Sequence, residues 1–464
     1  MKPNILFITS DQHRGDCLGI VGHSCVRTPH LDMLSKEACL FTQAHTDCPV
    51  CIPARTTIIT GIQSSIYGMP AYAQDYRIKR KREDFLGSIM TAAGYQTCLV
   101  GKSHWHTEPD FAGGFETWIS FSQYQREIKK YAGIYAEHGI GANEFSATYS
   151  YLNPAFYSTN WCVSKGIEFL LDREKARPFF LWLSFIDPHP ASVIHEPYYS
   201  MYDNDNIPPP HIPEWSTSDA CPFAIKKLRD GNSHNHMTEN ARKKAHGVYF
   251  GKITNIDHQL GRIFGFLKSN NLWDNTMIVY TTDHGDLLGD CGTYFKSNFI
   301  EGAAHIPLIV KAPVSISYQK NIRSDALIGL DDLLPTFCDL ASVKYPEDVS
   351  GKSFLPLLDG KNIKFRDYYH GQIEYQHMVL SNEYKYLYFV EDGRELLFER
   401  KNDPYDMRDI STEKKKITRY YREKLIDILK SKRSSHLKNG KLLNLNLKYK
   451  QKDFNYGLAW MGLH

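Results

Sequence analysis

The residues best suited to chemistry in this sequence lie around Cys51. This cysteine stands where a helix is expected to begin, and Arg55 follows one helical turn later in the string Cys-Ile-Pro-Ala-Arg. A helix N-terminus and a nearby cation both lower a thiol pKa, so Cys51 is a candidate nucleophile. Two alternatives are a buried structural thiol and a redox or zinc site shared with Cys48. Zinc is disfavoured because the sequence has no second Cys-x-x-Cys to complete a tetrahedral site.

Further polar residues follow predicted strands. Apolar runs of strand type occupy residues 4–9, 96–100, 179–185, 277–281 and 306–310, and helical patterns occupy 31–38, 85–93, 161–171 and 241–267. This alternation predicts an α/β domain with a large mixed, mostly parallel sheet flanked by helices. Open α/β sheets place their sites beyond the C-terminal ends of the strands. Four of these ends carry Asp11-Gln12, Lys102-Ser103-His104, Asp187-Pro188-His189 and Asp283-His284. We therefore expect these side chains to converge on one edge of the sheet.

Two of these pairs are candidate metal ligands. Asp11 with Gln12, and Asp283 with His284, are distant in sequence but equivalent in position. Carboxylate and amide oxygens suit Ca²⁺ or Mg²⁺, and a histidine shifts the preference toward Mn²⁺ or Zn²⁺. The sequence therefore predicts a divalent metal site.

The rest of the chain predicts a second, smaller domain. Residues 201–239 are rich in Pro, Asp, Asn and Ser, which indicates a long surface excursion. A helix is expected over 331–340 and a hinge over 351–360. Beyond it, a small antiparallel sheet (367–371, 385–390, 395–398) and a helix (417–429) predict a C-terminal α+β domain. We place the catalytic domain at 1–360 and the smaller domain at 361–464.

Composition limits the function classes. The 464 residues include 55 basic and 52 acidic side chains, so bulk charge will not steer the protein to nucleic acid. No apolar run approaches the ~20 residues of a membrane span. Ten scattered cysteines indicate a reducing compartment. Because the sequence enters an apolar strand at once, we expect a cytoplasmic protein, or a periplasmic or secreted one if its start was trimmed. Oligomeric state is left open.

The string from Cys51 to Arg55, with Thr60-Gly61 beyond it, resembles the signature of the type I sulfatases of the alkaline phosphatase superfamily. The segment from Gly94 to His104 resembles the second signature of that family. The resemblance runs in motif order from about residue 4 to 359. It implies an alkaline-phosphatase-like fold and hydrolysis of a sulfate ester. It also implies that Cys51 is oxidised to formylglycine by a formylglycine-generating or an anaerobic sulfatase-maturating enzyme.

The resemblance assigns catalysis to six residues: Cys51, Arg55, Lys102, His104, His189 and Lys296. A hydrated aldehyde at position 51, held by Arg55 and the metal, attacks sulfur while Lys102 and Lys296 neutralise the sulfuryl oxygens. His189, helped by Lys296, protonates the leaving oxygen. His104 then takes the proton of the second hydroxyl, which expels sulfate and restores the aldehyde. An unmodified cysteine lacks that second hydroxyl.

The resemblance also implies a metal, usually Ca²⁺, that binds the formylglycine and a sulfate oxygen. Many members carry Asp-Asp at the first ligand pair and Asp-Asn at the second. Gln12 and His284 depart from this pattern, so Mn²⁺ and Mg²⁺ stay open as alternatives.

The motifs do not specify the ester. Trp105, His106 and His305 are candidate substrate contacts, because such side chains stack on or hydrogen-bond to sugars. We expect a carbohydrate sulfate of glycosaminoglycan or mucin type, with aryl and choline sulfates as alternatives. A phosphonate monoester hydrolase or phosphodiesterase fits Asp283-His284, but Lys102-x-His104 fits a sulfatase better. A silent module that binds sulfated glycans would not need the modifiable cysteine.

Overall fold

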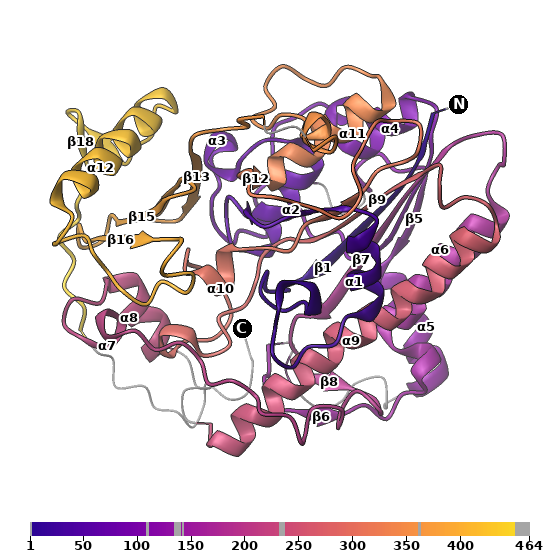
Figure 1. Ribbon diagram of the computed structural model, residues 1–464, viewed down its shortest axis with the longest axis horizontal. Helices are drawn as coiled ribbons and strands as arrows, with labels where there is room; N and C mark the ends of the chain where they lie inside the picture. The colour runs from indigo at the N-terminus through magenta and orange to yellow at the C-terminus, as the bar shows by residue number, and fades with distance from the viewer. Residues whose placement is uncertain are drawn as a thin grey trace.

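A large mixed sheet forms the centre of the protein in the computed structural model, which describes residues 2–107, 111–133, 141, 143–231, 237–360 and 363–450 (Figure 1). Its strands follow the order β11-β2-β10-β9-β1-β7-β4-β5. Their bounds are β1 (Asn4–Asp11), β2 (Cys39–Phe41), β4 (Gln96–Gly101), β5 (Thr117–Ser120), β7 (Phe179–Pro188), β9 (Thr276–Thr282), β10 (Ile309–Lys311) and β11 (Ile322–Ser324). The run β9-β1-β7-β4-β5 is parallel, whereas β10 is antiparallel to β9 and β2. The predicted mostly parallel sheet is confirmed.

Helices cover both faces of this sheet, because its central strands are apolar on both sides. Along β1, Ile5 and Phe7 face one core and Leu6 and Ile8 the other, as the period of two requires. The first core contains residues of α2, α4 and α11, and the second contains residues of α1, α5, α6 and α9. The bounds are α1 (Pro29–Lys36), α2 (Cys51–Thr60), α4 (Leu86–Ala92), α5 (Phe121–Ala132), α6 (Ser158–Asp172), α9 (Glu239–Ser269) and α11 (Leu333–Ala341).

A second, antiparallel sheet lies beside the first. Its strands pair in chain order as β13 (Tyr369–Ile373), β14 (Gln376–Leu380), β15 (Tyr384–Phe389) and β16 (Glu395–Glu399). One face packs on α12 (Lys415–Ser431). The other face shares a core with Val50, Phe299 and Ile300, close to Cys51 and Lys296 in the chain. The small sheet therefore supports the segments that carry two of the predicted catalytic residues.

Two predicted elements differ from the structure. The strand expected over 306–310 pairs only as Ile309–Lys311, since Pro307 has no N–H to donate. The excursion over 201–239 contains α7 (Glu214–Thr217) and α8 (Phe223–Asp230), which bury Trp215 and Ile225. Strands β2, β5, β11 and β14 and helix α5 were not predicted. The domain boundary at 360 stays a prediction.

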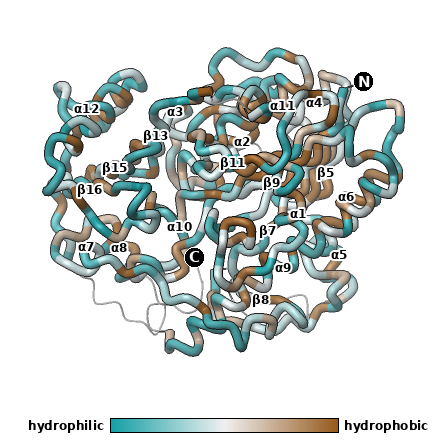
Figure 2. The backbone as a smooth tube through the Cα atoms, viewed as in Figure 1, coloured by the Kyte–Doolittle hydropathy of each residue, from teal (hydrophilic) through white to brown (hydrophobic). Residues whose placement is uncertain are grey.

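The described chain also has several shorter α-helices and strands. They are α3 (Ser64–Tyr67), α10 (Glu301–Ala304), β3 (Ala44–His45), β6 (Thr148–Tyr149), β8 (Val193–Ile194), β12 (Ile328–Gly329), β17 (Leu437–Lys438) and β18 (Lys441–Leu442). In Figure 2 the strands of the large sheet are mostly brown and the peripheral loops mostly teal or white. No helix among the described residues has the length and apolar character needed to cross a membrane.

A buried charge triad links the small sheet to the large domain. Lys385 on β15 is 0% exposed. Its ammonium lies 2.7 Å from the Glu301 carboxylate of α10 and 2.5 Å from that of Asp406. Burial raises the pKa of Asp406 to about 7, against the opposing effect of Lys385.

We predict that Lys385→Met destabilises the protein by about 3–5 kcal/mol, because two carboxylates lose their cation in a buried site. Denaturant unfolding followed by circular dichroism measures this, with Lys415→Met on the exposed face of α12 as control. Equal stability of the two variants would contradict the prediction.

Candidate active site

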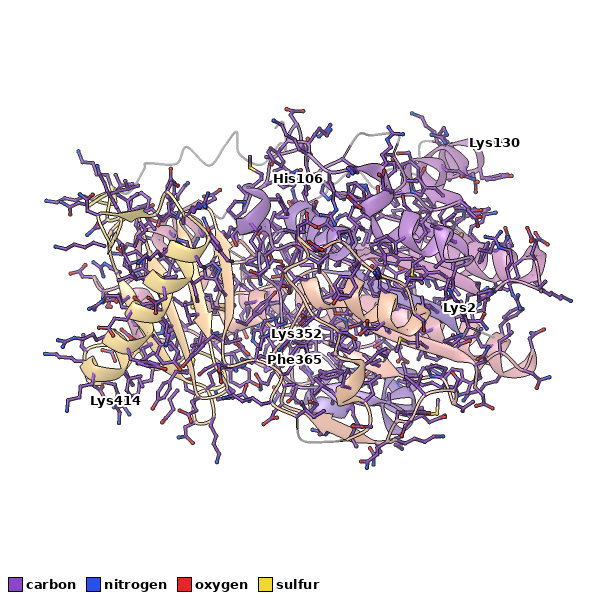
Figure 3. All side chains as sticks on the ribbon, turned by 90° about the horizontal axis from the view of Figure 1, so that it is seen from above. Lys2, His106, Lys130, Lys352, Phe365 and Lys414 are labelled. Carbon is purple, nitrogen blue, oxygen red and sulfur yellow. The ribbon has the colours of Figure 1, made fainter. Side chains whose placement is uncertain are left out.

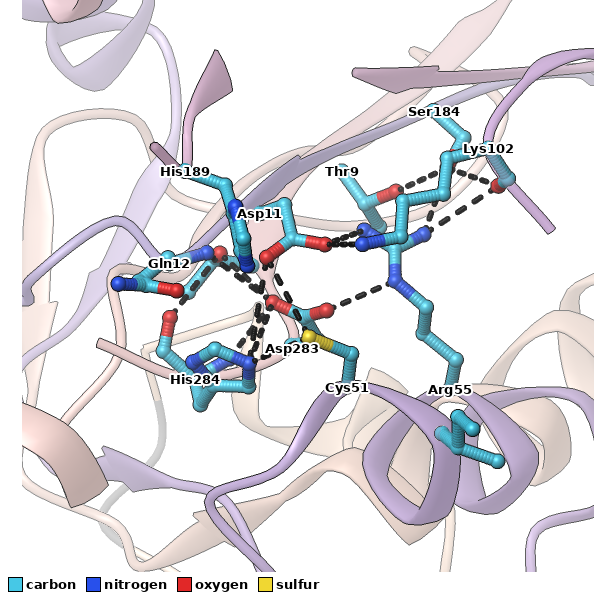
Figure 4. Close-up of polar contacts among 12 residues, drawn as sticks. Thr9, Asp11, Gln12, Cys51, Arg55, Lys102, Ser184, His189, Asp283 and His284 are labelled. Carbon is cyan, nitrogen blue, oxygen red and sulfur yellow. Dashed lines mark hydrogen bonds and ion pairs between the residues drawn. The ribbon is translucent and has the colours of Figure 1, made fainter. Parts of the chain in front are cut away.

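Predicted site residues converge at the carboxyl ends of four neighbouring strands. Strands β9, β1, β7 and β4 are adjacent and parallel, so the residues that follow them meet at one edge of the sheet. Figure 4 shows Asp11, Arg55, Cys51, Lys102, His189, Asp283 and His284 gathered there. The convergence expected from the sequence is thus what the structure shows.

Helix α2 brings Cys51 and Arg55 to this edge. Val50 is extended and Cys51 is the first helical residue. Pro53 fits the first turn, where its missing N–H costs no hydrogen bond. Gly61 ends the helix in the left-handed conformation (φ 68°), which glycine adopts without strain. Every residue of α2 is buried, so Cys51 and Arg55 are held by packing on all sides.

Arg55 is the cation at the centre of the site, and it is 0% exposed. Its Nε donates to Asp283 Oδ2 at 2.7 Å, and Nη2 donates to Asp11 Oδ2 at 3.3 Å. Nη1 donates to Ser184 Oγ at 2.8 Å. The guanidinium thereby fixes one oxygen of each carboxylate, and the second oxygen of Asp11 faces the Cys51 thiol at 3.6 Å.

A four-residue cluster fits a metal ion. Ligand atoms of Asp11, Cys51, Asp283 and His284 lie within 4.8 Å of one another, and all four residues are buried. His284 Nδ1 lies 2.9 Å from the Gly285 carbonyl, which can only accept, so Nε2 is the nitrogen left for a metal. Nε2 is 3.1 Å from Cys51 Sγ. Two carboxylates and an imidazole suit Ca²⁺ or Mn²⁺.

Gln12 stands apart from the other three predicted ligands. Its backbone N–H donates to Asp283 Oδ1 at 3.2 Å, but its side-chain amide contacts Asp286 and Lys296. Asp286 is fully buried, accepts the Leu288 N–H at 2.7 Å, and was not predicted. The signal that could have found it is a second carboxylate three residues after Asp283.

The cations lie on the more open side of the site. Lys102, His104, His189 and Lys296 are partly exposed, whereas Asp11, Arg55 and Asp283 are 0% exposed. Burial alone would raise the pKa of Cys51, but Lys102, Lys296 and His284 hold it well below its usual range. Positive charge on the open side of the site, above the buried carboxylates, suits an anionic ligand.

The position of Lys102 depends on the preceding residue, Gly101. Gly101 has φ 103°, and a Cβ there would lie 2.1 Å from the Ser184 carbonyl oxygen. Only glycine permits this approach of β4 to β7. Lys102 then contacts the Asp11 carboxylate. His104 adopts φ 56° two residues later, which turns the loop at the mouth of the site.

His189 and Lys296 form a second unit. Lys296 Nζ lies 2.9 Å from His189 Nε2, and His189 Nδ1 faces the Pro190 carbonyl. A carbonyl accepts only, so Nδ1 carries a proton and Nε2 accepts from the ammonium. Burial and Lys296 lower the pKa of His189. The pair therefore holds a proton that can be passed to an oxygen bound beside it.

A buried ion pair that sequence analysis missed holds the His189 turn. Lys252 of α9 is 2% exposed and donates to the carbonyls of His189 (2.6 Å) and Ala191 (2.8 Å). Its ammonium also lies 3.0 Å from Asp187 Oδ1. The available signal was a lysine within the apolar part of a predicted helix.

Two of the three predicted substrate contacts, Trp105 and His106, are buried by packing. Trp105 lies in the core, 5.9 Å from the Trp182 ring, and His106 is 0% exposed. His305 stacks on His45 at 5.1 Å and lines a cavity of about 860 Å³ whose lining does not include Cys51. The contacts of these three residues with a substrate stay predictions.

Comparison with known proteins gives the class. The sulfatase family model matches residues 3–343, and the model of the N-sulphoglucosamine sulphohydrolase C-terminal region matches residues 289–433. An arylsulfatase of Clostridium perfringens is 30% identical, over 96% of this chain and 98% of its own length. An N-acetylglucosamine-6-O-sulfatase of Bacteroides thetaiotaomicron is 23% identical, over 88% of this chain and 82% of its own length.

Solved structures agree on the fold. A phosphonate monoester hydrolase of Agrobacterium radiobacter superposes with a TM-score of 0.82 at 22% identity, over 93% of this chain and 96% of its own. The chain belongs to the sulfatase family, and the predicted alkaline-phosphatase-like fold is confirmed. The predicted enzyme class, sulfuric ester hydrolase, is confirmed at this level.

We predict that Lys252→Met lowers kcat by about 10- to 100-fold on an alkyl sulfate and much less on an activated aryl sulfate. The His189 turn loses its anchor, and only the alkyl leaving group needs a proton. Steady-state kinetics on both substrates measure the difference, with Lys243→Met on the exposed side of α9 as control. Equal losses on the two substrates would reject the positioning role.

Proposed function

We propose that the protein hydrolyses a sulfate ester of a carbohydrate through a formylglycine derived from Cys51 and a divalent metal. The observation that carries the proposal is the convergence of Cys51 and Arg55 of α2 with Lys102, which contacts Asp11, and with the His189–Lys296 pair. A binding module would not need this set.

The chemistry divides between the modified residue and the side chains around it. Formylglycine at position 51 would supply a hydrated aldehyde with two hydroxyls, one to attack sulfur and one to allow release of sulfate. Lys102 and Lys296 lie on the open side of the site, where they neutralise the sulfuryl oxygens. His189 and Lys296 deliver the proton to the leaving oxygen, and His104 accepts the proton of the remaining hydroxyl.

The metal would be held by Asp11, Asp283 and His284, with Gln12 as the fourth ligand if its amide turns from Lys296. When bound, the ion supplies positive charge against the sulfuryl group. The carboxylates suit Ca²⁺, and His284 makes Mn²⁺ the first alternative, with Mg²⁺ next.

Support for a carbohydrate sulfate comes from relatives. The Bacteroides relative is named an N-acetylglucosamine-6-O-sulfatase, and another solved structure with a TM-score of 0.73 holds D-glucosamine-2-N,6-O-disulfate. The Clostridium relative is named an arylsulfatase, so aryl sulfates belong in the test.

A phosphonate monoester or phosphodiester substrate is the second candidate. Its support is the pair Asp283-His284, together with the TM-score of 0.82 to a phosphonate monoester hydrolase. Lys102 and His104 at the mouth favour the sulfatase.

Sulfate release from a panel tests the proposal. The protein is co-expressed with a formylglycine-generating enzyme and offered sulfated monosaccharides, glycosaminoglycan disaccharides, an aryl sulfate and a phosphonate monoester. Release from one sugar position supports the proposal. If no sulfate ester is hydrolysed, the aldehyde is confirmed by mass spectrometry and the phosphonate is cleaved, the result would favour a phosphonate monoester or phosphodiester substrate.

We predict that Cys51→Ala and Cys51→Ser both lower kcat by at least about 10³-fold without unfolding the protein, because neither residue offers a hydrated aldehyde. Inorganic sulfate release and thermal melting measure the two effects. The matched control is Cys48→Ser, which leaves the helix start intact. Full turnover by a Cys51 variant would remove the formylglycine mechanism.

Metal dependence gives a separate prediction. Exhaustive chelation should abolish turnover, and adding back Ca²⁺, Mn²⁺ or Mg²⁺ singly should show which ion restores it. Asp283→Asn should weaken metal affinity by about 10- to 100-fold, since it removes a charged ligand and an Arg55 partner. Calorimetric titration with each ion checks this. Undiminished activity after chelation, with no metal found by elemental analysis, would contradict the metal assignment.

A further inference from the structure

A strongly basic segment borders the loop that carries Lys102 and His104. Residues 77–82 have the sequence Arg-Ile-Lys-Arg-Lys-Arg, five basic side chains in six positions. The whole chain is nearly balanced, with 55 basic and 52 acidic residues. Like charges this close repel one another, and a segment of this kind is stabilised by a polyanion.

The segment is attached directly to the site loop. The Ile78 N–H donates to the His106 carbonyl at 2.9 Å, and the Tyr76 ring lies 5.1 Å from the His106 ring. Just before it, the Tyr72 ring lies 6.1 Å from the ring of His104. The basic segment therefore pairs with the site loop two residues after His104, and the chain that precedes it contacts His104.

Alternate side chains of this segment face opposite sides. Ile78 packs on the core of the large domain, and the Arg80 side chain is 3% exposed and lies 2.8 Å from Asp348. Arg77 is half-buried, and Lys79 and Lys81 are exposed. In an extended chain, residues two apart share a face about 6.5–7 Å apart. Arg77, Lys79 and Lys81 are the alternate positions that neither pack on the core nor pair with Asp348, and we call them the basic row.

None of Arg77, Lys79 and Lys81 forms an ion pair with a carboxylate among the residues that the structure describes, although Asp75, Glu83 and Asp84 flank the segment in the sequence. Of the five cations in residues 77–82, Arg80 is the one with a carboxylate partner among the residues that the structure describes. The other four contact no carboxylate there, although Arg82 lies over the Phe111 ring at 5.0 Å. Arg77 donates to the Gln74 and Tyr76 carbonyls. Cations without a carboxylate partner, close together along the chain, suit a ligand that carries several anionic groups in sequence.

We propose that the basic row binds anionic groups of a polysulfated saccharide chain next to the sulfate ester that is cleaved. This inference rests on the proposed function and narrows its substrate class. A monosulfated sugar carries a single anionic group, which occupies the active site. No anionic group of this sugar is then left to contact the basic row. A polysulfated chain places further charges beside the mouth, where Arg77, Lys79 and Lys81 meet them. Such exposed contacts strengthen binding and are screened by salt.

The test compares two substrates on the mature enzyme: a polysulfated glycosaminoglycan oligosaccharide and a monosulfated monosaccharide. The variant R77Q/K79Q/K81Q removes the row. Three exposed charge contacts of ordinary strength together amount to roughly tenfold in affinity. We expect KM for the oligosaccharide to rise about tenfold relative to KM for the monosaccharide, with the ratio of the two kcat values unchanged. Raising ionic strength should produce the same shift in the parent enzyme.

Two control variants test whether the change in KM is specific to the positive charges of the basic row. K414Q/K415Q/K416Q removes three exposed lysines at the start of α12, and Figure 3 shows Lys414 far from His106. This variant should retain the preference for the oligosaccharide. R77K/K79R/K81R keeps the charge and should retain it as well. Thermal melting confirms that each variant is folded.

A binding measurement separates this inference from the proposed function. Cys51→Ala cannot turn over, so calorimetry measures its affinity for the oligosaccharide directly, with and without the three row substitutions. Loss of about tenfold in affinity supports the row even if the ester chemistry proves different. Equal affinity, equal changes for both substrates, or the same loss in K414Q/K415Q/K416Q would overturn it. Tighter, row-dependent binding of a single-stranded oligonucleotide would assign the row to nucleic acid instead.

Discussion

The buried Arg55 guanidinium, held between the Asp11 and Asp283 carboxylates, is the interaction on which the rest of the site depends. This interaction connects α2 to the ends of β1 and β9. These two strands are more than two hundred residues apart in the sequence. A buried cation of this kind is stable only with its partners in place, because removing one leaves an unpaired charge in a dry interior. The position of Cys51, one turn earlier on the same helix, follows from this contact.

Around that centre, charge is arranged in two layers. The floor is acidic and fully enclosed, and the mouth is basic and partly open. The floor suits a metal ion, and the mouth suits an anion that approaches from solvent. The two layers support each other, since Lys102 contacts Asp11 from above while Arg55 contacts it from the side. The small antiparallel sheet closes the arrangement by packing on the chain next to Cys51 and Lys296.

Much of the large sheet and of the active site could be predicted from the sequence. Buried parallel strands are recognisable as apolar runs, and the carboxyl ends of such strands lie at the same edge of the sheet. The strands carrying Asp11, Lys102, His189 and Asp283 were predicted for that reason. Lys252 was missed because its partners lie more than sixty residues away and only the fold brings them together. Trp105 was assigned to substrate because a sequence does not tell which side of a loop faces the core. Strand β14 was missed because it begins with the polar residues Gln376 and His377, which leaves an apolar run of only Met378, Val379 and Leu380.

The enclosure of Cys51 also bears on when the protein can acquire its proposed activity. The thiol is 4% exposed, and the whole of α2 lies inside the domain. A modifying enzyme needs access to the residue that it oxidises. In the folded protein every residue of α2 is buried, so Cys51 is not accessible to such an enzyme. If Cys51 is the modified residue, oxidation has to precede folding. Maturation then competes with the collapse of the chain, and every molecule that folds first is a stable but inactive product.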